Sequence, residues 1–137
     1  MHIVLPSAMK RKILYSISTV LTVVILTSKC MAQDPKIYRI AKIQVDPAQL
    51  GQYNAALKEQ MTTAIRVEPG VLSYYAVSDK KEPSHITIFE IYADSAAYNA
   101  HIQAPHFKKY KETVKEMVKS LELEDVEVIG TAKKPGM

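Results

Sequence analysis

The segment from His85 to Tyr92 constrains the fold most, because it predicts a β-strand with two very different faces. Side chains alternate across a strand, so Glu90 and Tyr92 share one face, while Phe89 and Ile91 share the other. The Phe89 face is apolar, and the Glu90 face suits the wall of a polar pocket. A strand of this kind requires a sheet with helices on one side and a further layer on the other.

The order of the predicted elements supports such a sheet. Strand patterns alternate with amphipathic helical patterns at 37–45 (strand), 46–68 (helix), 71–78 (strand), 85–92 (strand), 94–121 (helix, interrupted at 104–105) and 123–129 (strand). This β-α-β-β-α-β order predicts an α+β fold of the ferredoxin-like, split type, in which an antiparallel sheet has helices on one face. We find no repeat or linker, so residues 33–137 are predicted to form one domain.

Local sequence features predict where the helices begin and break. Asp46 precedes Pro47, and Gln49 stands where it can close a capping box. Asp94 is placed to cap the second helical region, and Pro105 interrupts that region and starts it again. The apolar stripe of the resumed helix continues to Leu121.

Residues 1–32 have the features of a signal peptide. A basic triplet at 10–12 precedes the uncharged apolar run 13–27, which is shorter than the roughly 18–20 residues of a spanning helix. Small residues at Cys30 and Ala32 indicate cleavage after Ala32. We therefore expect an exported protein, periplasmic or secreted, without stable membrane association after cleavage. A retained N-terminal anchor and a lipid-modified Cys30 are the alternatives.

Removing residues 1–32 balances the charge of the chain. The whole sequence has 18 Lys and Arg against 14 Asp and Glu, and this segment contributes four of the basic residues and no acid. The remainder has no basic stripe that would indicate nucleic-acid binding. Cys30 is the only cysteine in the sequence, so the mature part is expected to contain no disulfide, thiolate metal site or cysteine nucleophile.

The apolar strand face predicts self-association. Helices can cover only one face of the sheet, so the other would leave Phe89, Ile91 and neighbouring apolar side chains in water. Monomers rarely expose so large an apolar patch. We therefore expect a homodimer in which two sheets pack face to face and form a barrel.

The stretch from Phe89 to Tyr110 concentrates the groups able to move a proton. Glu90 lies on the polar strand face, and His101 lies one helical turn after Tyr98. His106 follows Pro105 at a helix N-terminus, where the dipole disfavours a protonated ring. The alternative for each is structural: a packed or surface histidine, and a salt-bridged glutamate.

A metal site is not predicted. His101 and His106 are five residues apart with a proline between them, whereas an i, i+4 pair would place two imidazoles on one helix face. Glu90 would complete a set of two histidines and a carboxylate, but nothing in the spacing requires it.

Aromatic side chains are the predicted contacts to a ligand. They are Tyr75, Tyr92, Tyr98, Phe107 and Tyr110, with Glu90 as their polar neighbour. Tyr74 and Tyr75 point to opposite faces of their strand, so at most one of them can line the pocket. Core packing is the alternative for Tyr75, Tyr92 and Tyr98.

Four short motifs resemble the antibiotic biosynthesis monooxygenase family, and most of all its quinol monooxygenase branch. They are Glu68-Pro69-Gly70-Val71-Leu72, Phe89-Glu90-Ile91-Tyr92, Ala100-His101 and Ala104-Pro105-His106-Phe107. The resemblance covers roughly residues 36–130. It implies a dimeric α+β barrel and, as in many members, use of dioxygen without metal, flavin or haem. The haem-degrading branch has a tryptophan where Tyr92 stands here, so haem degradation is not expected.

The resemblance implies a cofactor-independent monooxygenase that oxidises a quinol or similar small phenol. A deprotonated phenol can give an electron to dioxygen itself, so the protein needs a base, hydrogen-bond donors and a dry cage. His101 and His106 are the candidate catalytic bases. The alternative is a non-catalytic or stress-related protein that binds a small molecule in the same pocket.

Overall fold

The computed structural model describes residues 35–136, so the predicted signal peptide lies outside the described residues. In chain order the elements are β1 (Ile37–Val45), the 3₁₀ turn η2 (Pro47–Gln49), α2 (Leu50–Val67), β2 (Val71–Ser78), β3 (His85–Tyr92), α3 (Ser95–Gln103), α4 (Pro105–Val114) and β4 (Val118–Val126). Within this described part, no helix has the length and apolar character needed to cross a membrane.

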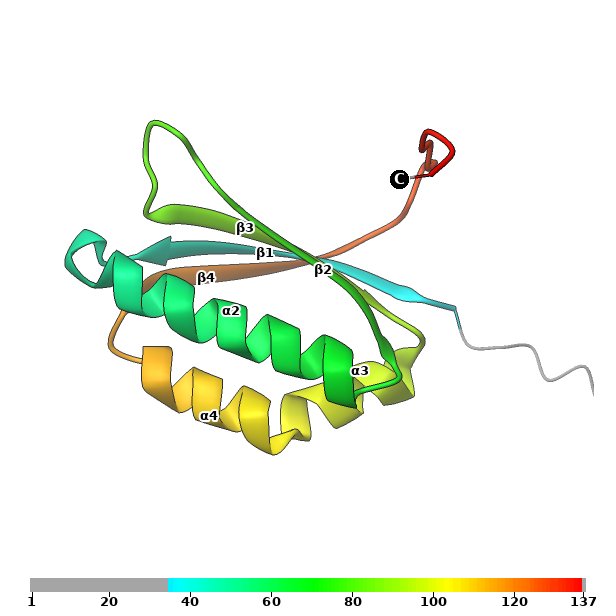
Figure 1. Ribbon diagram of the computed structural model, residues 1–137, viewed down its shortest axis with the longest axis horizontal. Helices are drawn as coiled ribbons and strands as arrows, with labels where there is room; N and C mark the ends of the chain where they lie inside the picture. The colour runs from blue at the N-terminus through cyan, green and yellow to red at the C-terminus, as the bar shows by residue number, and fades with distance from the viewer. Residues whose placement is uncertain (1–34, 137) are drawn as a thin grey trace, which may run out of the picture. The chain divides into compact units, whose positions relative to one another are not determined.

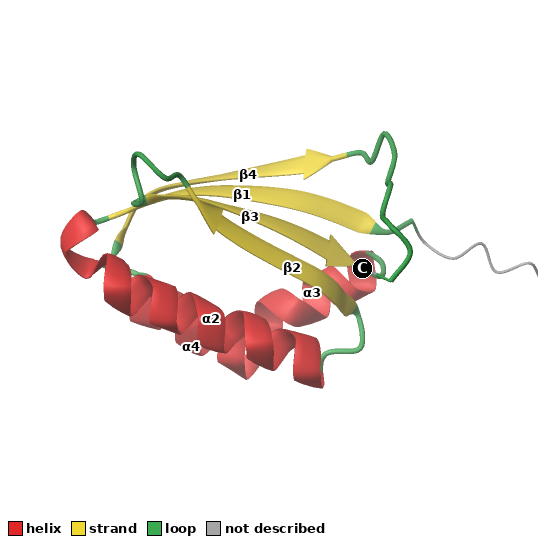
Figure 2. Ribbon diagram, turned by 45° about the horizontal axis from the view of Figure 1, so that its top comes forward, coloured by secondary structure: helices red, strands yellow, loops and turns green. Residues whose placement is uncertain are grey.

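The four strands form one antiparallel sheet in the order β2-β3-β1-β4. The central strands β1 and β3 pair from Ile37 opposite Tyr92 to Gln44 opposite His85. Helices α2, α3 and α4 all lie on the same side of this sheet, and α2 runs beside α4 (Figures 1 and 2). The predicted split β-α-β-β-α-β fold is confirmed.

The helix starts follow the predicted caps in part. The Asp46 carboxylate accepts a hydrogen bond from the Ala48 backbone N–H at 3.0 Å. Gln49 does not close a capping box, because the chain first forms the turn η2. The Gln49 side chain instead donates to the Glu116 carbonyl at 3.4 Å.

The predicted break in the second helical region is confirmed. Asp94 caps α3 by accepting from the Ala97 N–H at 2.7 Å. The Ala104 N–H bonds to the His101 carbonyl at 3.0 Å, and Ala104 has extended dihedral angles. Pro105 then starts α4 in a new direction. This change of direction brings the first turn of α4 close to His101 of α3.

The segment after α4 differs from the prediction of a helix to Leu121 followed by a strand over Leu123–Ile129. The helix ends at Val114, and β4 already begins at Val118. The apolar spacing of this segment fits a helix, but the free edge of β1 offers backbone partners along its length. Pairing with that edge satisfies the backbone of β4 and takes precedence over the local helical pattern.

The core lies between the helices and the sheet. Its larger cluster joins β1 and β3 to α2 and the end of α4 through Ala41, Ile43, Val45, Tyr53, Leu57, Ile86, Ile88, Val114 and Met117. A smaller cluster at the other end joins Ala64, Val71 and Tyr92. Gly70 is required there, because a methyl group at that position would overlap Ala97 Cβ of α3. The Gly70 carbonyl also accepts from the Ala93 N–H at 2.9 Å.

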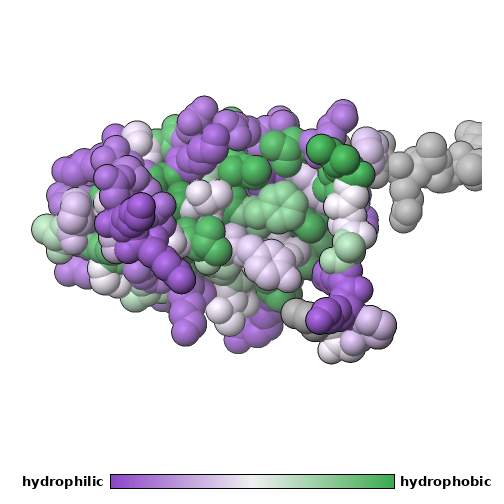
Figure 3. Space-filling model, turned by 90° about the horizontal axis from the view of Figure 1, so that it is seen from above, coloured by the Kyte–Doolittle hydropathy of each residue, from purple (hydrophilic) through white to green (hydrophobic). Residues whose placement is uncertain are grey.

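The face of the sheet opposite the helices carries a band of apolar side chains, which we call the open face. By strand alternation and register it comprises Tyr38, Ile40, Tyr75, Val77, Phe89 and Ile91. Figure 3 shows apolar side chains gathered over the strands on this side, with hydrophilic ones around them. The predicted apolar character of the Phe89 face is therefore confirmed.

Candidate functional site

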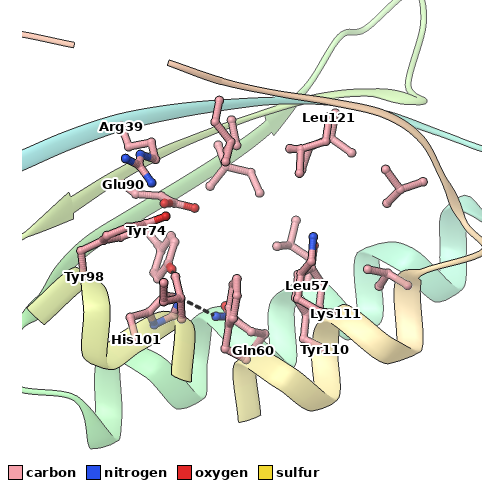
Figure 4. Close-up of a pocket in the computed structure, with 18 of the residues that line it drawn as sticks. Arg39, Leu57, Gln60, Tyr74, Glu90, Tyr98, His101, Tyr110, Lys111 and Leu121 are labelled. Carbon is pink, nitrogen blue, oxygen red and sulfur yellow. Dashed lines mark hydrogen bonds between the residues drawn. The ribbon is translucent and has the colours of Figure 1, made fainter. Parts of the chain in front are cut away.

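A cavity of about 100 Å³ lies between the sheet and the helices. It is lined by Arg39, Ala41, Ile43, Leu57, Gln60, Tyr74, Ile88, Glu90, Tyr92, Tyr98, His101, Ile102, Phe107, Tyr110, Lys111, Val114, Val118, Leu121 and Leu123. Figure 4 shows Arg39, Glu90, Tyr74 and Tyr98 grouped at one end, and Leu121 at the other. The cavity thus has a polar end and a mainly apolar remainder, an arrangement typical of small-molecule sites.

Glu90 places a carboxylate at the polar end of the cavity. Strand alternation puts it on the same face as Tyr92, whose hydroxyl donates to Glu90 Oε2 at 2.9 Å. Burial raises the pKa of Glu90 above its ordinary value of 4.5, against the opposing effects of the Tyr92 hydrogen bond and of Arg39. Glu90 therefore takes up a proton more readily than an exposed glutamate does.

Arg39 supplies a fixed positive charge beside this carboxylate. It lies opposite Glu90 in the register of β1 and β3. Asp125 of β4 accepts from Arg39 Nε at 2.8 Å and from its Nη2 at 2.6 Å. The guanidinium Cζ also lies 4.1 Å from the centre of the Tyr98 ring, within the range of a cation–π contact. These contacts hold the charge in place at the cavity wall.

His101 is buried behind the tyrosines, with 1% of its surface exposed. Its Nδ1–H donates to Glu68 Oε1 at 2.8 Å. Its Nε2 accepts from the Tyr74 hydroxyl at 2.8 Å and from the Gln60 amide at 3.3 Å, the bond drawn in Figure 4. Burial lowers the pKa of His101, and Glu68 partly offsets this effect. The imidazole is therefore neutral at neutral pH.

Glu68 links His101 to His106. His106 Nε2 lies 2.8 Å from the same Glu68 oxygen that His101 contacts. The side chains of Glu68 and His106 are 14% and 18% exposed, so this cluster reaches the surface. His106 does not line the cavity and contacts it only through Glu68 and His101. The sequence showed Glu68 as a helix end and as part of one motif, but not as a partner of the histidines, because these are 33 and 38 residues distant.

The tyrosine in the cavity wall of β2 is Tyr74, and the assignment of Tyr75 has to be corrected. Tyr74 lies opposite Glu90 on the inner face, and its hydroxyl is 2.9 Å from that of Tyr92. Tyr75 lies opposite Phe89 on the open face and is 62% exposed. The strand pattern showed that the two point in opposite directions but could not show which face the helices cover. Burial raises the pKa of both Tyr74 and Tyr92, so both hydroxyls stay protonated.

The predicted aromatic positions on the helices do line the cavity. Phe107 packs against His101 with ring centres 4.6 Å apart. The Tyr110 hydroxyl is 2.8 Å from that of Tyr53, a fully buried residue of α2. Tyr98 stands edge-on to Tyr92 with centres 5.3 Å apart. Side chains from α3 and α4 thus close the cavity below the sheet.

A cation would find its best set of donor atoms at Glu68, His101 and His106. Within residues 35–136 their nitrogen and oxygen atoms form one such group, all within 4.8 Å of one another. In this structure the three side chains satisfy one another, because a single carboxylate oxygen accepts from both imidazoles.

Known proteins with similar sequences share this fold. A crystal structure of a candidate antibiotic biosynthesis monooxygenase from Bacteroides thetaiotaomicron is 50% identical, with a TM-score of 0.69 over 72% of this chain and 94% of that one. A candidate monooxygenase from Lactobacillus acidophilus is 33% identical, with a TM-score of 0.66 over 69% of this chain and 45% of that one.

A curated relative of unknown function comes from Synechocystis. It is 29% identical over 96 residues, and the match spans 66% of this chain and 65% of that protein. The sequence profile of the antibiotic biosynthesis monooxygenases matches residues 36–113, which include β1 to β3, α3 and the residues of the cavity's polar end. The chain therefore belongs to the antibiotic biosynthesis monooxygenase family.

Proposed function

We propose that the protein is a monooxygenase that oxidises a quinol or similar small phenol with dioxygen, without metal, flavin or haem. The family and the relatives named as monooxygenases support the reaction class. The observation that carries the proposal is the placement of Glu90, a half-buried carboxylate with a raised pKa, at the polar end of a mainly apolar cavity.

The residues at the polar end match the needs of a phenolic substrate. Glu90 accepts the substrate proton, and Arg39 favours the phenolate that results. Tyr98 and Phe107 offer ring faces and edges for an aromatic ligand. The aliphatic remainder of the wall offers an apolar surface for the rest of the substrate.

The proposed reaction balances without a further reductant. The substrate ionises by losing one proton, from a ring CH₂ group of its keto tautomer or equally from the hydroxyl group of its phenol tautomer. The resulting anion gives one electron to dioxygen, and the substrate radical and superoxide combine to a peroxide anion at that ring carbon. This anion takes one proton and becomes a hydroperoxide. Loss of water from that hydroperoxide breaks the O–O bond and leaves a carbonyl. One oxygen atom stays in the product, the other leaves as water, and the proton taken at the start is returned in that water.

A homodimer formed through the open face is part of the proposal. The open face carries four aliphatic and aromatic side chains on the two central strands, where Tyr38 stacks on Phe89 with ring centres 6.4 Å apart. Tyr75 and Val77 extend it on β2, and each is 62% exposed. Burying such a band against a second copy removes apolar area from water.

Export also belongs to the proposal, since the predicted signal peptide would deliver the domain to an oxidising compartment that holds dioxygen. Cell fractionation and mass determination of the mature N-terminus test it. We expect the mature chain to begin at Gln33; recovery of the intact chain in the membrane fraction would favour the retained anchor.

Oxygen uptake by the purified protein with a panel of hydroquinones tests the proposed function. Uptake should exceed the autoxidation blank, persist after treatment with a chelator, and accompany an absorption spectrum without flavin or haem. Glu90→Gln should lower kcat by about 10²- to 10⁴-fold, the usual contribution of a positioned base.

Glu112→Gln is the matched control, because Glu112 is exposed on α4 and outside the cavity. It should leave the rate unchanged. Equal losses in the two variants would contradict the role of Glu90. Ligands that raise the melting temperature while no oxygen is consumed would favour the alternative of a binding protein.

A further inference from the structure

A chain of hydrogen bonds leads from the cavity into the interior of the domain. Glu90 Oε2 is 2.9 Å from the Tyr92 hydroxyl, which is 2.9 Å from the Tyr74 hydroxyl. The Tyr74 hydroxyl in turn lies 2.8 Å from His101 Nε2. Tyr92 and His101 are each 1% exposed, so this path runs along the wall of the cavity and is shielded from bulk solvent.

The same chain continues to the surface on the far side of His101. His101 Nδ1 is 2.8 Å from Glu68 Oε1, which is 2.8 Å from His106 Nε2. Glu68 and His106 are both partly exposed. Every step from the cavity to the surface is therefore a hydrogen bond of ordinary length between groups that can give and accept a proton.

We propose that this chain is a proton relay that connects Glu90 in the cavity with Glu68 and His106 at the surface. The inference rests on the proposed function, because it starts from Glu90 as the acceptor of the substrate proton. It assigns Tyr92, Tyr74 and His101 as positioning residues that carry the proton without touching the reacting atoms.

The donors and acceptors along these hydrogen bonds set the direction of transfer. A carboxylate can only accept, so the contact of His101 Nδ1 with Glu68 Oε1 places the hydrogen on Nδ1 and leaves Nε2 as an acceptor. Nδ1–H therefore donates to Glu68, and Tyr74 donates to Nε2. When Glu90 is protonated, it donates to Tyr92, Tyr92 donates to Tyr74, and all donors point toward the surface.

A single shift along this aligned chain moves one proton outward. Each O–H or N–H bond breaks as the next one forms, so Glu90 loses a proton and Glu68 gains one. The two tyrosines end neutral, and His101 changes tautomer from Nδ1–H to Nε2–H. Glu68, which is partly exposed, then passes the proton to water.

The proposed reaction also explains how the chain of hydrogen bonds returns to its starting state. Oxidation of a CH₂ carbon by dioxygen to a carbonyl and water has no net uptake or release of protons. One proton moves outward when the substrate ionises, and one moves inward when the peroxide anion becomes the hydroperoxide. The inward transfer restores the tautomer of His101 and both hydroxyl orientations, so no buried ring has to turn.

Tyr74→Phe is the variant that tests the relay, because it removes one hydroxyl from the middle of the chain and keeps the ring. Tyr53→Phe is the matched control: it also removes a buried hydroxyl bonded to another tyrosine, but Tyr53 lies outside both the chain and the cavity. Circular dichroism confirms that both variants are folded.

Turnover is then measured over a range of imidazole buffer concentrations at constant pH and ionic strength. We expect the wild type and Tyr53→Phe to be independent of buffer concentration. Tyr74→Phe should lose about 10- to 100-fold in kcat with little change in KM, within the usual range for proton transfer, and should regain rate as buffer increases. A Tyr74→Phe rate that equals wild type, or a loss that buffer does not restore, would overturn the relay.

A second measurement needs no oxygen chemistry and separates the two hypotheses. 4-Nitrophenol is mixed rapidly with the protein, its ionisation is followed by the colour of the phenolate, and release of the proton is followed with a pH indicator in solution. In the wild type the two signals should rise together. In Tyr74→Phe the indicator should lag.

The two results can fail separately. In one outcome the wild type takes up no oxygen, its two nitrophenol signals coincide, and they no longer coincide in Tyr74→Phe. This outcome would contradict the monooxygenase and support the relay. Oxygen uptake with identical indicator kinetics in both proteins would keep the monooxygenase and remove the relay. No ionisation of bound nitrophenol would also remove the relay, because Glu90 would then not accept a phenol proton.

Discussion

Replacement of Glu68 by alanine should destabilise the domain strongly, although Glu68 is partly exposed. The substitution removes the acceptor of two hydrogen bonds, one from His101 and one from His106. His106 is at the surface, where water can replace the lost partner. His101 is 1% exposed, so its Nδ1–H would be left buried without an acceptor.

The expected cost follows from that buried donor. An unsatisfied buried polar group costs about 1–3 kcal/mol, and a bond to a charged acceptor lies at the upper end, so we expect a loss of about 2–3 kcal/mol. For a domain of this size that corresponds to a fall in Tm of about 10–20 °C. Urea titration and thermal unfolding at pH 7.5 measure both quantities.

Glu59→Ala is the matched control. Glu59 also accepts one charged hydrogen bond, from Lys109 Nζ at 2.9 Å, but both side chains are about two-thirds exposed. An exposed pair of this kind contributes about 0–1 kcal/mol. Glu68→Gln, which keeps one carbonyl oxygen, should recover part of the loss. A Glu68→Ala variant as stable as Glu59→Ala would refute the argument that the His101 donor is sealed from water.

We make three further predictions, which concern His101, Glu90 and the open face. Burial holds the pKa of His101 below its unfolded value of 6.5. The contribution of neutral His101 to the free energy of unfolding should therefore be complete above about pH 6.5 and fall as the pH drops further. In urea titrations, His101→Phe should make the free energy of unfolding depend less on pH in this range. The acidic limb of the pH profile of kcat/KM should lie above pH 4.5, because the pKa of Glu90 is raised. Arg39→Met should move this limb to higher pH, because the Arg39 charge lowers the pKa of Glu90. Tyr75→Asp on the open face should produce monomers in sedimentation experiments, whereas Ile65→Asp, at a 48% exposed position on α2, should not.

The sequence predicted the fold well because strand and helix periods are local properties. The two faces of β3, the cap at Asp94 and the break at Pro105 all depend on residues within a few positions of one another. The predicted end of α4 was wrong because it depends on a distant part of the sequence. Pairing of β4 with β1 joins segments about eighty residues apart, and no local pattern records that partner.

The site was predicted less completely for the same physical reason. Glu90, His101 and the aromatic residues were found because they cluster in one stretch of the chain. Arg39, Tyr74 and Glu68 come from other elements, and only the folded sheet brings them to Glu90 and His101. The error at Tyr75 shows that alternation separates two faces without identifying the inner one.

The edge of the cavity at β4 has a consequence for how substrates can change in evolution. Leu121 and Leu123 lie opposite Ile43 and Ala41 on the helix side of the sheet, yet they are 44% and 53% exposed. Half-exposed side chains contribute less to stability than core residues do, so exchanging them costs little free energy of folding. The width and polarity of the cavity at this edge can therefore change under selection for new ligands. The polar end, which is hydrogen-bonded to core residues, can stay unchanged while this happens.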